Sequence, residues 1–146
     1  MKILACTDGS KNSQKALEVA ATIAEGCNPD EVAIIHVHFP PDIAYWESLT
    51  GESDGPFSGW RERHKVAALT ILSEATKIFE KKNIEAATIL EQGHPAETIL
   101  KVASEKGFDM IVLGSRGMGG LRKALLGSVS GAVVQEAEDC NVLTVK

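Results

Sequence analysis

Short apolar runs without polar interruption most narrow the folds open to this 146-residue chain. Met110 to Leu113 is the clearest run, and Ile3 to Cys6 has the same character. A continuous apolar run of this length is typical of a strand that is covered on both faces. Strands of that kind belong to parallel sheets, whose crossover connections are usually helices. The sequence therefore predicts an α/β fold.

Strands and helices alternate from one end of the chain to the other. We expect strands at about residues 3–6, 32–39, 86–90, 110–113 and 142–145, and helices at about 10–26, 60–82, 95–106 and 128–137. This alternation predicts a parallel sheet with helices on both faces. The winding of such a sheet reverses at one point, which leaves a crevice outside the carboxyl ends of two neighbouring strands. If the first and fourth strands flank that reversal, Asp8 and Gly114 face each other across the crevice.

Cap and breaker residues predict where the helices begin and end. Ser10 or Ser13 can cap the first helix, and Gly26 sits where that helix ends. Pro95 suits the first position of its helix, and Gly107 suits the exit. The helix at 60–82 repeats apolar residues three or four apart, and we expect this stripe to face the core: Val66, Leu69, Leu72, Ala75 and Phe79. Residues 40–59 are rich in proline and glycine, which predicts a long loop.

Composition and charge indicate a single folded domain over residues 1–146. Hydrophobic residues make up 44% of the chain, which is enough for a core without disulfide or metal staples. The net charge of −5 argues against a nucleic-acid backbone as the main partner. Because no apolar stretch approaches the ~18 residues of a membrane span and no signal-peptide core is present, we expect a cytoplasmic protein without membrane contact. Three widely separated cysteines fit a reducing compartment: Cys6, Cys27 and Cys140.

A glycine-rich segment from Gly114 to Ser130 connects a buried strand to the start of a helix. Glycines let backbone amides approach an anion closely, and a helix N-terminus adds N–H groups with partial positive charge. Ser128 and Ser130 can add hydroxyl donors. These features indicate a phosphate site, and the alternative is a loop whose glycines serve only turns. The spacing fits neither a P-loop nor the dinucleotide G-x-G-x-x-G pattern.

The histidines and Cys6 favour structural interpretations. His36 and His38 lie two apart on a predicted strand, so they share a face and in principle a metal ion. No third ligand at a matching spacing accompanies them. We expect His94 to be a turn or cap residue, and the thiol of Cys6 to be buried and inert.

The spacing Gly114-x2-Gly117-x9-Gly127-Ser128 resembles the G-2X-G-9X-G(S/T) signature of ATP-binding universal stress proteins. Thr7 to Ser10 resembles the first strand and turn of that family, and Ile35 to Val37 the end of its second strand. The order of elements agrees over essentially the whole chain. The resemblance implies a Rossmann-like, adenine nucleotide alpha hydrolase-like three-layer sandwich. Its five-stranded parallel sheet would have the order 3-2-1-4-5.

The resemblance also implies which residues hold ATP. Thr7, Asp8 and Val37 would hold the adenosine half, with adenine against the backbone of Val37. The segment after the fourth strand would border ribose and phosphate, and the start of the last helix would cradle the phosphate chain. Asp8 would alternatively assist Mg²⁺ or Mn²⁺ beside the phosphates, or serve only as a turn residue. The full set of expected nucleotide-binding residues is Cys6, Thr7, Asp8, Val37, Gly114, Ser115, Arg116, Gly117, Gly127, Ser128, Val129 and Ser130.

Three functions remain open from the sequence. The first is a regulatory module of the stress response whose nucleotide occupancy is read by an unidentified protein partner. The second is an ATPase or adenylyl-transferring enzyme on the same fold, although no base or substrate pocket is evident and we expect hydrolysis to be absent or slow. The third is a dimeric scaffold that binds no nucleotide. By resemblance we expect a homodimer formed through the last strand, where Asn141 stands in place of the proline common in the family.

Overall fold

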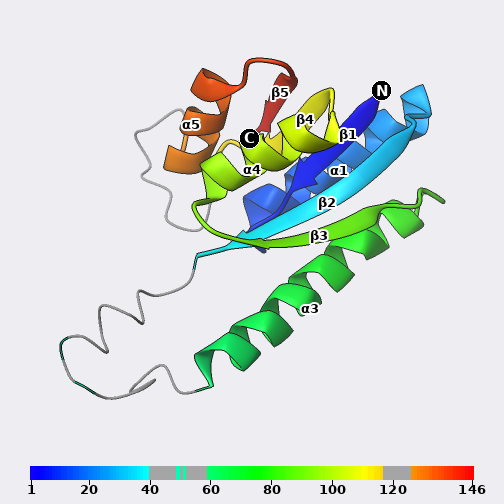
Figure 1. Ribbon diagram of the computed structural model, residues 1–146. Coiled ribbons are helices and arrows are strands. Elements are labelled where there is room, and N and C mark those ends of the chain that lie inside the picture. The colour runs from blue at the N-terminus through cyan, green and yellow to red at the C-terminus, as the bar shows by residue number, and fades with distance from the viewer. Residues whose placement is uncertain (40–48, 50, 52–58, 117–125) are drawn as a thin grey trace.

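A computed structural model describes residues 1–39, 49, 51, 59–116 and 126–146 (Figure 1). Its five strands are β1 (Lys2–Cys6), β2 (Glu31–His38), β3 (Ala87–Gln92), β4 (Met110–Gly114) and β5 (Asn141–Val145). The helices α1 (Lys11–Cys27), α3 (Trp60–Glu80), α4 (Pro95–Lys106) and α5 (Ser128–Glu136) alternate with them. The strands form one parallel sheet in the order β3-β2-β1-β4-β5. This confirms the fold class and the strand order expected from the sequence.

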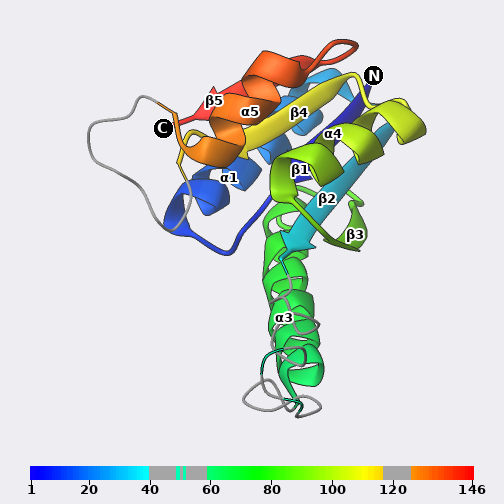
Figure 2. The ribbon, with the colours of Figure 1, turned by 60° about the vertical axis from the view of Figure 1, so that its left-hand side comes forward.

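The sheet is the middle layer of three (Figures 1 and 2). Helices α1 and α3 cover one face, where Leu17, Leu72 and Phe79 pack in one core cluster with β-strand residues such as Ile34. Helices α4 and α5 cover the other face, where Ile99 and Val133 belong to a second cluster. Because both faces are covered, the central strands are apolar throughout: Ile3, Leu4, Ile111 and Val112 are each fully buried.

The helix caps follow the sequence signals at three of the four positions that they predict. Ser10 caps α1, and its Oγ accepts a hydrogen bond from the Ser13 N–H at 3.2 Å. Pro95 opens α4, and Gly107 closes it in the left-handed region at φ 66°. The prediction that α1 ends at Gly26 is wrong. The helix continues to Cys27, and Asn28 provides the left-handed cap at φ 46°, since asparagine tolerates that region better than most residues.

The apolar stripe of α3 is core along only part of its length. Leu72, Ala75 and Phe79 are buried as expected, but Val66 is 63% exposed and Leu69 50% exposed, so the prediction is wrong at this end. A helix of 21 residues is roughly 31 Å long, whereas strands of five to eight residues reach about 16–26 Å. The N-terminal half of α3 therefore extends beyond the edge of the sheet, as Figure 2 shows.

Most of the predicted loop at 40–59 lies outside the described residues. The strand expected at 86–90 is found slightly later, at Ala87–Gln92. Within the described part of the chain, no helix combines the length and the apolarity needed to cross a membrane.

Candidate functional site

The sheet reverses its winding between β1 and β4, and a sheet of this topology has a crevice outside the carboxyl ends of the two strands that flank the reversal. Thr7 and Asp8 follow β1 directly, and Gly114 is the last residue of β4. Val37 is the last residue but one of β2. Strand β2 pairs with β1 on the side away from β4. The topology therefore gathers the candidate residues from three separate segments at one edge of the sheet.

Thr7 is fixed on several sides at the end of β1. Its N–H donates to the Ile35 carbonyl at 3.0 Å, and its hydroxyl lies 3.1 Å from the Ser13 hydroxyl. The same threonine oxygen accepts from the Gly9 N–H at 3.2 Å. Thr7 is 7% exposed. These contacts make the turn after β1 a rigid wall of the crevice rather than a free loop.

Asp8 is half-buried and takes part in that turn. Its Oδ1 accepts from the Ser10 N–H at 2.9 Å, while Ser10 caps α1. The carboxylate therefore stabilises the turn, as the turn-residue interpretation of the sequence predicts, whatever ligand role it has in addition. A carboxylate oxygen is a ligand that Mg²⁺ accepts, and phosphate oxygens would have to supply further ligands. Among residues 1–39, 59–116 and 126–146, no three His, Cys, Asp or Glu side chains are grouped so as to hold a metal ion.

Gly114 allows two backbone segments to meet at the crevice. A Cβ at this position would lie 3.0 Å from the Asn12 carbonyl carbon and 3.1 Å from the carbonyl oxygen of Arg116. Both are backbone atoms, which cannot move aside as a flexible side chain can. A side chain at residue 114 would thus push the start of α1 away from the end of β4.

The start of α5 is bound to the end of β4 by a clasp of hydrogen bonds, which we call the α5 clasp: Ser115, Gly127 and Ser130. The Gly127 N–H donates to the Ser115 carbonyl at 2.7 Å, and the Ser130 hydroxyl donates to the same oxygen at 2.8 Å. Ser130 is 3% exposed, and the Ser115 N–H donates to the Val145 carbonyl of β5 at 2.7 Å. The clasp holds the α5 N-terminus at the edge of the sheet where β4 ends.

Helix α5 begins without a side-chain cap. Its N-cap is Gly127, which has no oxygen to accept from the first turn. The N–H groups of Ser128, Val129 and Ser130 are the first of the helix, and such groups have no partner within a helix. Ser128 is exposed and Val129 is half-buried. An anion in the crevice would find unpaired N–H donors and the positive end of a helix dipole here.

The remaining candidates differ in accessibility. Cys6 is 6% exposed and belongs to the core cluster beneath α4 and α5, where burial raises the pKa of its thiol. Arg116 is half-buried and already has an interaction partner. Gly117 lies outside the described residues. Cys6 thus adjoins the candidate site only through its neighbour Thr7, and its thiol is buried as predicted.

The structure adds residues that the sequence interpretation had not placed in the site. His36 is 8% exposed, and its Nδ1 lies 2.8 Å from the Thr7 carbonyl oxygen. Ser13 contacts Thr7, and Asn12 contacts Gly114. The Ser10-x-x-Ser13 spacing is a visible helix-start signal, but nothing in the sequence connects Asn12 with Gly114.

The prediction that His94 is a turn or cap residue is confirmed. His94 is the N-cap residue of α4, although its side chain makes no capping hydrogen bond.

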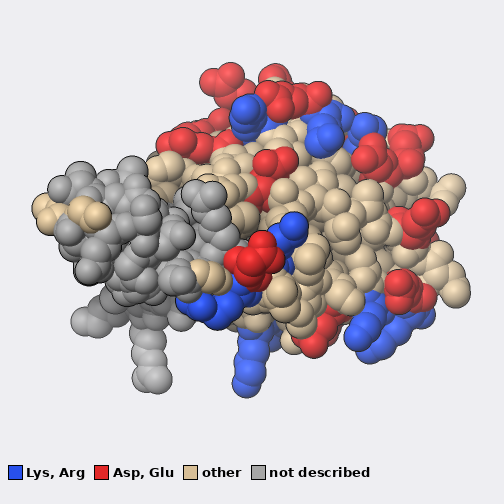
Figure 3. All heavy atoms as spheres, turned by 60° about the horizontal axis from the view of Figure 1, so that its bottom comes forward, with Lys and Arg blue, Asp and Glu red and all other residues tan. Residues whose placement is uncertain are grey.

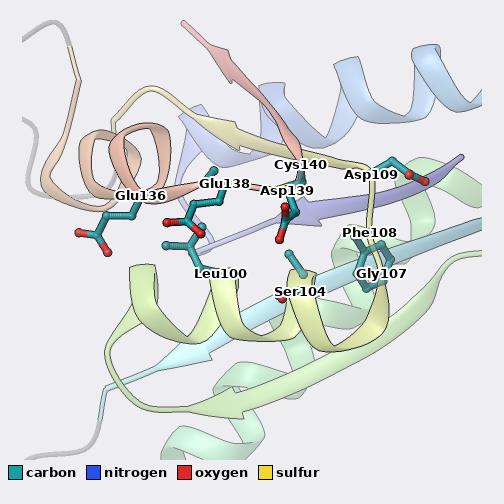
Figure 4. Close-up of a pocket in the computed structure, with 11 residues that line it drawn as sticks. Leu100, Ser104, Gly107, Phe108, Asp109, Glu136, Glu138, Asp139 and Cys140 are labelled. Atoms are coloured by element: carbon teal, nitrogen blue, oxygen red, sulfur yellow. The ribbon is translucent and has the colours of Figure 1, made fainter.

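A hollow of about 280 Å³ lies at the opposite ends of the strands, between the C-terminal ends of α4 and α5 (Figure 4). Four carboxylates line it: Asp109, Glu136, Glu138 and Asp139. Helix C-termini carry partial negative charge, so this hollow repels anions. On the face shown in Figure 3, acidic and basic side chains are interspersed with uncharged ones. The hollow therefore does not suit a phosphate, whereas the start of α5 offers N–H donors to one.

Comparison with known proteins agrees with this fold. The Universal stress protein family model matches residues 1–146. Universal stress protein YxiE of Bacillus subtilis (strain 168) is 39% identical over 148 residues, which cover 99% of this chain and 98% of YxiE.

Two solved structures resemble the chain over nearly all of its length. That of hypothetical protein MJ0577 has a TM-score of 0.81 at 28% identity and covers 99% of this chain and 94% of that one. A universal stress protein solved in complex with cAMP has a TM-score of 0.69 at 24% identity, with coverage of 100% and 96%. The match of the family model from end to end, together with a full-length relative, shows that this chain belongs to the universal stress protein family.

Proposed function

We propose that this protein binds an adenine nucleotide, and ATP in particular, in the crevice at the carboxyl ends of β1, β2 and β4. The triphosphate would lie against the N-terminus of α5 and the adenosine against Thr7, Asp8 and Val37. Nucleotide occupancy would then be read by a protein partner as a regulatory signal in the stress response.

The observation that carries the proposal is the uncapped start of α5, held in place by the α5 clasp. At the N-cap position helices prefer serine, threonine, aspartate or asparagine, whose side-chain oxygen accepts a hydrogen bond from one of these N–H groups. Here Gly127 leaves the donors of Ser128 to Ser130 without such a side chain. Serine hydroxyls and backbone N–H groups suit a phosphate chain, and Mg²⁺ would balance part of the charge of that chain. In that arrangement Asp8 would supply an oxygen ligand to Mg²⁺ from the opposite wall.

The fold supports an adenine nucleotide in particular. The related structure with a TM-score of 0.69 holds cAMP, so a protein of this fold accommodates adenine, ribose and phosphate together. The glycine spacing Gly114-x2-Gly117-x9-Gly127-Ser128 resembles the ATP-binding members of the family. We assign no catalytic residue and expect hydrolysis to be slow or absent.

We also propose that the protein is a homodimer paired through β5. This strand is at the edge of the sheet, and its residues Val142 to Val145 are only half-buried in the single chain. An uncovered edge strand with apolar residues is a template for pairing with another chain. Analytical ultracentrifugation tests whether the protein dimerises, and a monomer at all concentrations would contradict the proposed homodimer.

A charge placed at the α5 N-terminus tests the phosphate site. Ser128→Glu puts a carboxylate where the helix dipole favours it, so the free protein should be as stable as wild type or more stable. The same carboxylate repels the triphosphate, and calorimetric titration should show ATP affinity reduced at least tenfold.

Gln135→Glu is the matched control, because it adds the same charge to an exposed position near the other end of α5. It should leave ATP affinity unchanged. An unaltered affinity in Ser128→Glu would show that the phosphates lie elsewhere. Release of inorganic phosphate measured with Mg²⁺ and ATP then separates the two nucleotide functions, since many turnovers per minute would favour the enzyme.

A further inference from the structure

The buried histidine of β2, His36, makes a hydrogen bond across the sheet at the carboxyl end of β1. His36 is 8% exposed, and its Nδ1 lies 2.8 Å from the backbone carbonyl oxygen of Thr7. A carbonyl oxygen can only accept a hydrogen bond, so Nδ1 must carry the proton. The imidazole therefore donates across from β2 to the end of β1, at the wall of the crevice.

This hydrogen bond replaces one that the sheet would otherwise make. The register of β1 and β2 ends at the pair Cys6 and Ile35, and the Thr7 N–H donates to the Ile35 carbonyl. In a parallel ladder the next bond would run from the Val37 N–H to the Thr7 carbonyl. That carbonyl instead accepts from His36. Among the described residues, no hydrogen bond joins Val37 to Thr7.

The direction of the Val37 peptide follows from its neighbours. The Ile35 carbonyl points toward β1, where it accepts from Thr7, and the His38 carbonyl points toward β3, where it accepts from Gly93 at 3.0 Å. Alternate residues of a central parallel strand point their N–H and C=O groups to the same neighbour. The N–H and C=O of Val37 thus point to the β1 side, beyond the end of the ladder and into the crevice.

We infer that His36 is a positioning residue that keeps the backbone N–H and C=O of Val37 free to bind the edge of a purine base. Adenine presents a ring nitrogen acceptor beside an amino donor, and a peptide N–H beside a C=O complements that pair. Guanine presents an N–H donor beside a carbonyl acceptor and is mismatched on both. A site that hydrogen-bonds one arrangement rejects the other because buried polar groups are left unpaired. His36 thereby gives the site its preference for adenine, an inference that rests on the proposed nucleotide function.

The ligand-free protein gives the first test. The Val37 amide should exchange with solvent rapidly although it lies in a central strand, and its exchange should slow when ATP is added. Strong protection in the free protein would overturn the inference, because it would mean that the Val37 N–H is already bonded within the protein.

Nucleotide titrations give the second test, with ATP, GTP and inorganic tripolyphosphate as probes. In His36→Leu, ATP affinity should fall about tenfold, the equivalent of one net hydrogen bond. GTP and tripolyphosphate affinities should stay unchanged, so the preference for adenine is lost. His36→Asn places an amide donor near the position of Nδ1 and should restore most of the preference, and His94→Gln should match wild type.

The outcomes separate this inference from the proposal beneath it. A wild-type protein that binds no adenine nucleotide would refute both. A wild-type protein that prefers ATP, with the same preference in His36→Leu, would refute only the role of His36. Equal losses for ATP, GTP and tripolyphosphate would assign His36 a purely structural role. Should His36→Leu fail to fold, a folded His36→Asn without any preference for adenine would also refute the inference.

Discussion

At the scale of single residues, the crevice depends on a close approach of two backbones at Gly114. In Gly114→Ala the added Cβ would lie 3.0 Å from the Asn12 carbonyl carbon, so α1 or β4 must shift. We expect a loss of about 1–3 kcal/mol in the free energy of unfolding, measured with urea. Gly26→Ala is the control, because no atom lies within 4 Å of its Cβ and it sits within α1. It should stabilise the protein by about 0.5–1 kcal/mol, and equal effects of the two variants would contradict the close approach.

The sequence indicates candidate site residues, but it does not reveal the contacts between them. The glycine spacing led to Gly127 and Ser130, because the chemistry of anion binding at a helix start is local in sequence. The contact between Asn12 and Gly114 was missed, since it joins segments about one hundred residues apart and leaves no local pattern. The sequence favours a structural role for His36, but its partner is a backbone carbonyl, which no residue identity reveals.

At the scale of the elements, the helix ends show how a cap acts through its backbone. Gly107 closes α4 at φ 66°, and a Cβ there would meet no atom within 4 Å. Gly107→Ala should therefore destabilise the protein by about 1 kcal/mol through backbone conformation alone. Gly107→Asn should cost less, because asparagine tolerates this region, as Asn28 does after α1. Chemical denaturation of the two variants checks this, and a larger loss for asparagine would contradict it.

Helix starts were predictable where side-chain chemistry marks them, as Ser10 and Pro95 do. The end of α1 was not, because Gly26 and Asn28 are both acceptable caps and packing decides between them. The part of α3 that the sequence predicts to be buried is too long for a related reason. Periodicity indicates that a helix has an apolar face, but Val66 and Leu69 lie beyond the sheet edge that would bury them.

At the scale of the whole molecule, the three cysteines lie at different depths, so their reactivity tests how closed the core is. Cys6 lies in the core, Cys140 is half-buried, and Cys27 is exposed. Burial raises the pKa of the Cys6 thiol, and burial with nearby Asp139 raises that of Cys140, which lowers the thiolate fraction of both at neutral pH. Brief treatment of the native protein with N-ethylmaleimide, read by mass spectrometry, should modify Cys27 first, Cys140 more slowly and Cys6 only after unfolding. Early modification of Cys6 would contradict a closed core.

The three-layer architecture could be predicted because it follows from few facts. Continuous apolar strands require covering on both faces, and right-handed crossovers limit the arrangements of the sheet. The exact α3 overhang depends on element lengths and on tertiary packing, which no local pattern contains.

The central claim is that the N-terminus of α5 receives the phosphates of an adenine nucleotide. NMR amide shifts of the ¹⁵N-labelled protein, recorded during titration with ATP and separately with tripolyphosphate, test it most directly. We predict that both ligands move the amides of Gly127 to Ser130 and that only ATP also moves those of Thr7 and Val37. Saturation with ATP that leaves Gly127 to Ser130 unmoved, or no saturation at all, would contradict the account.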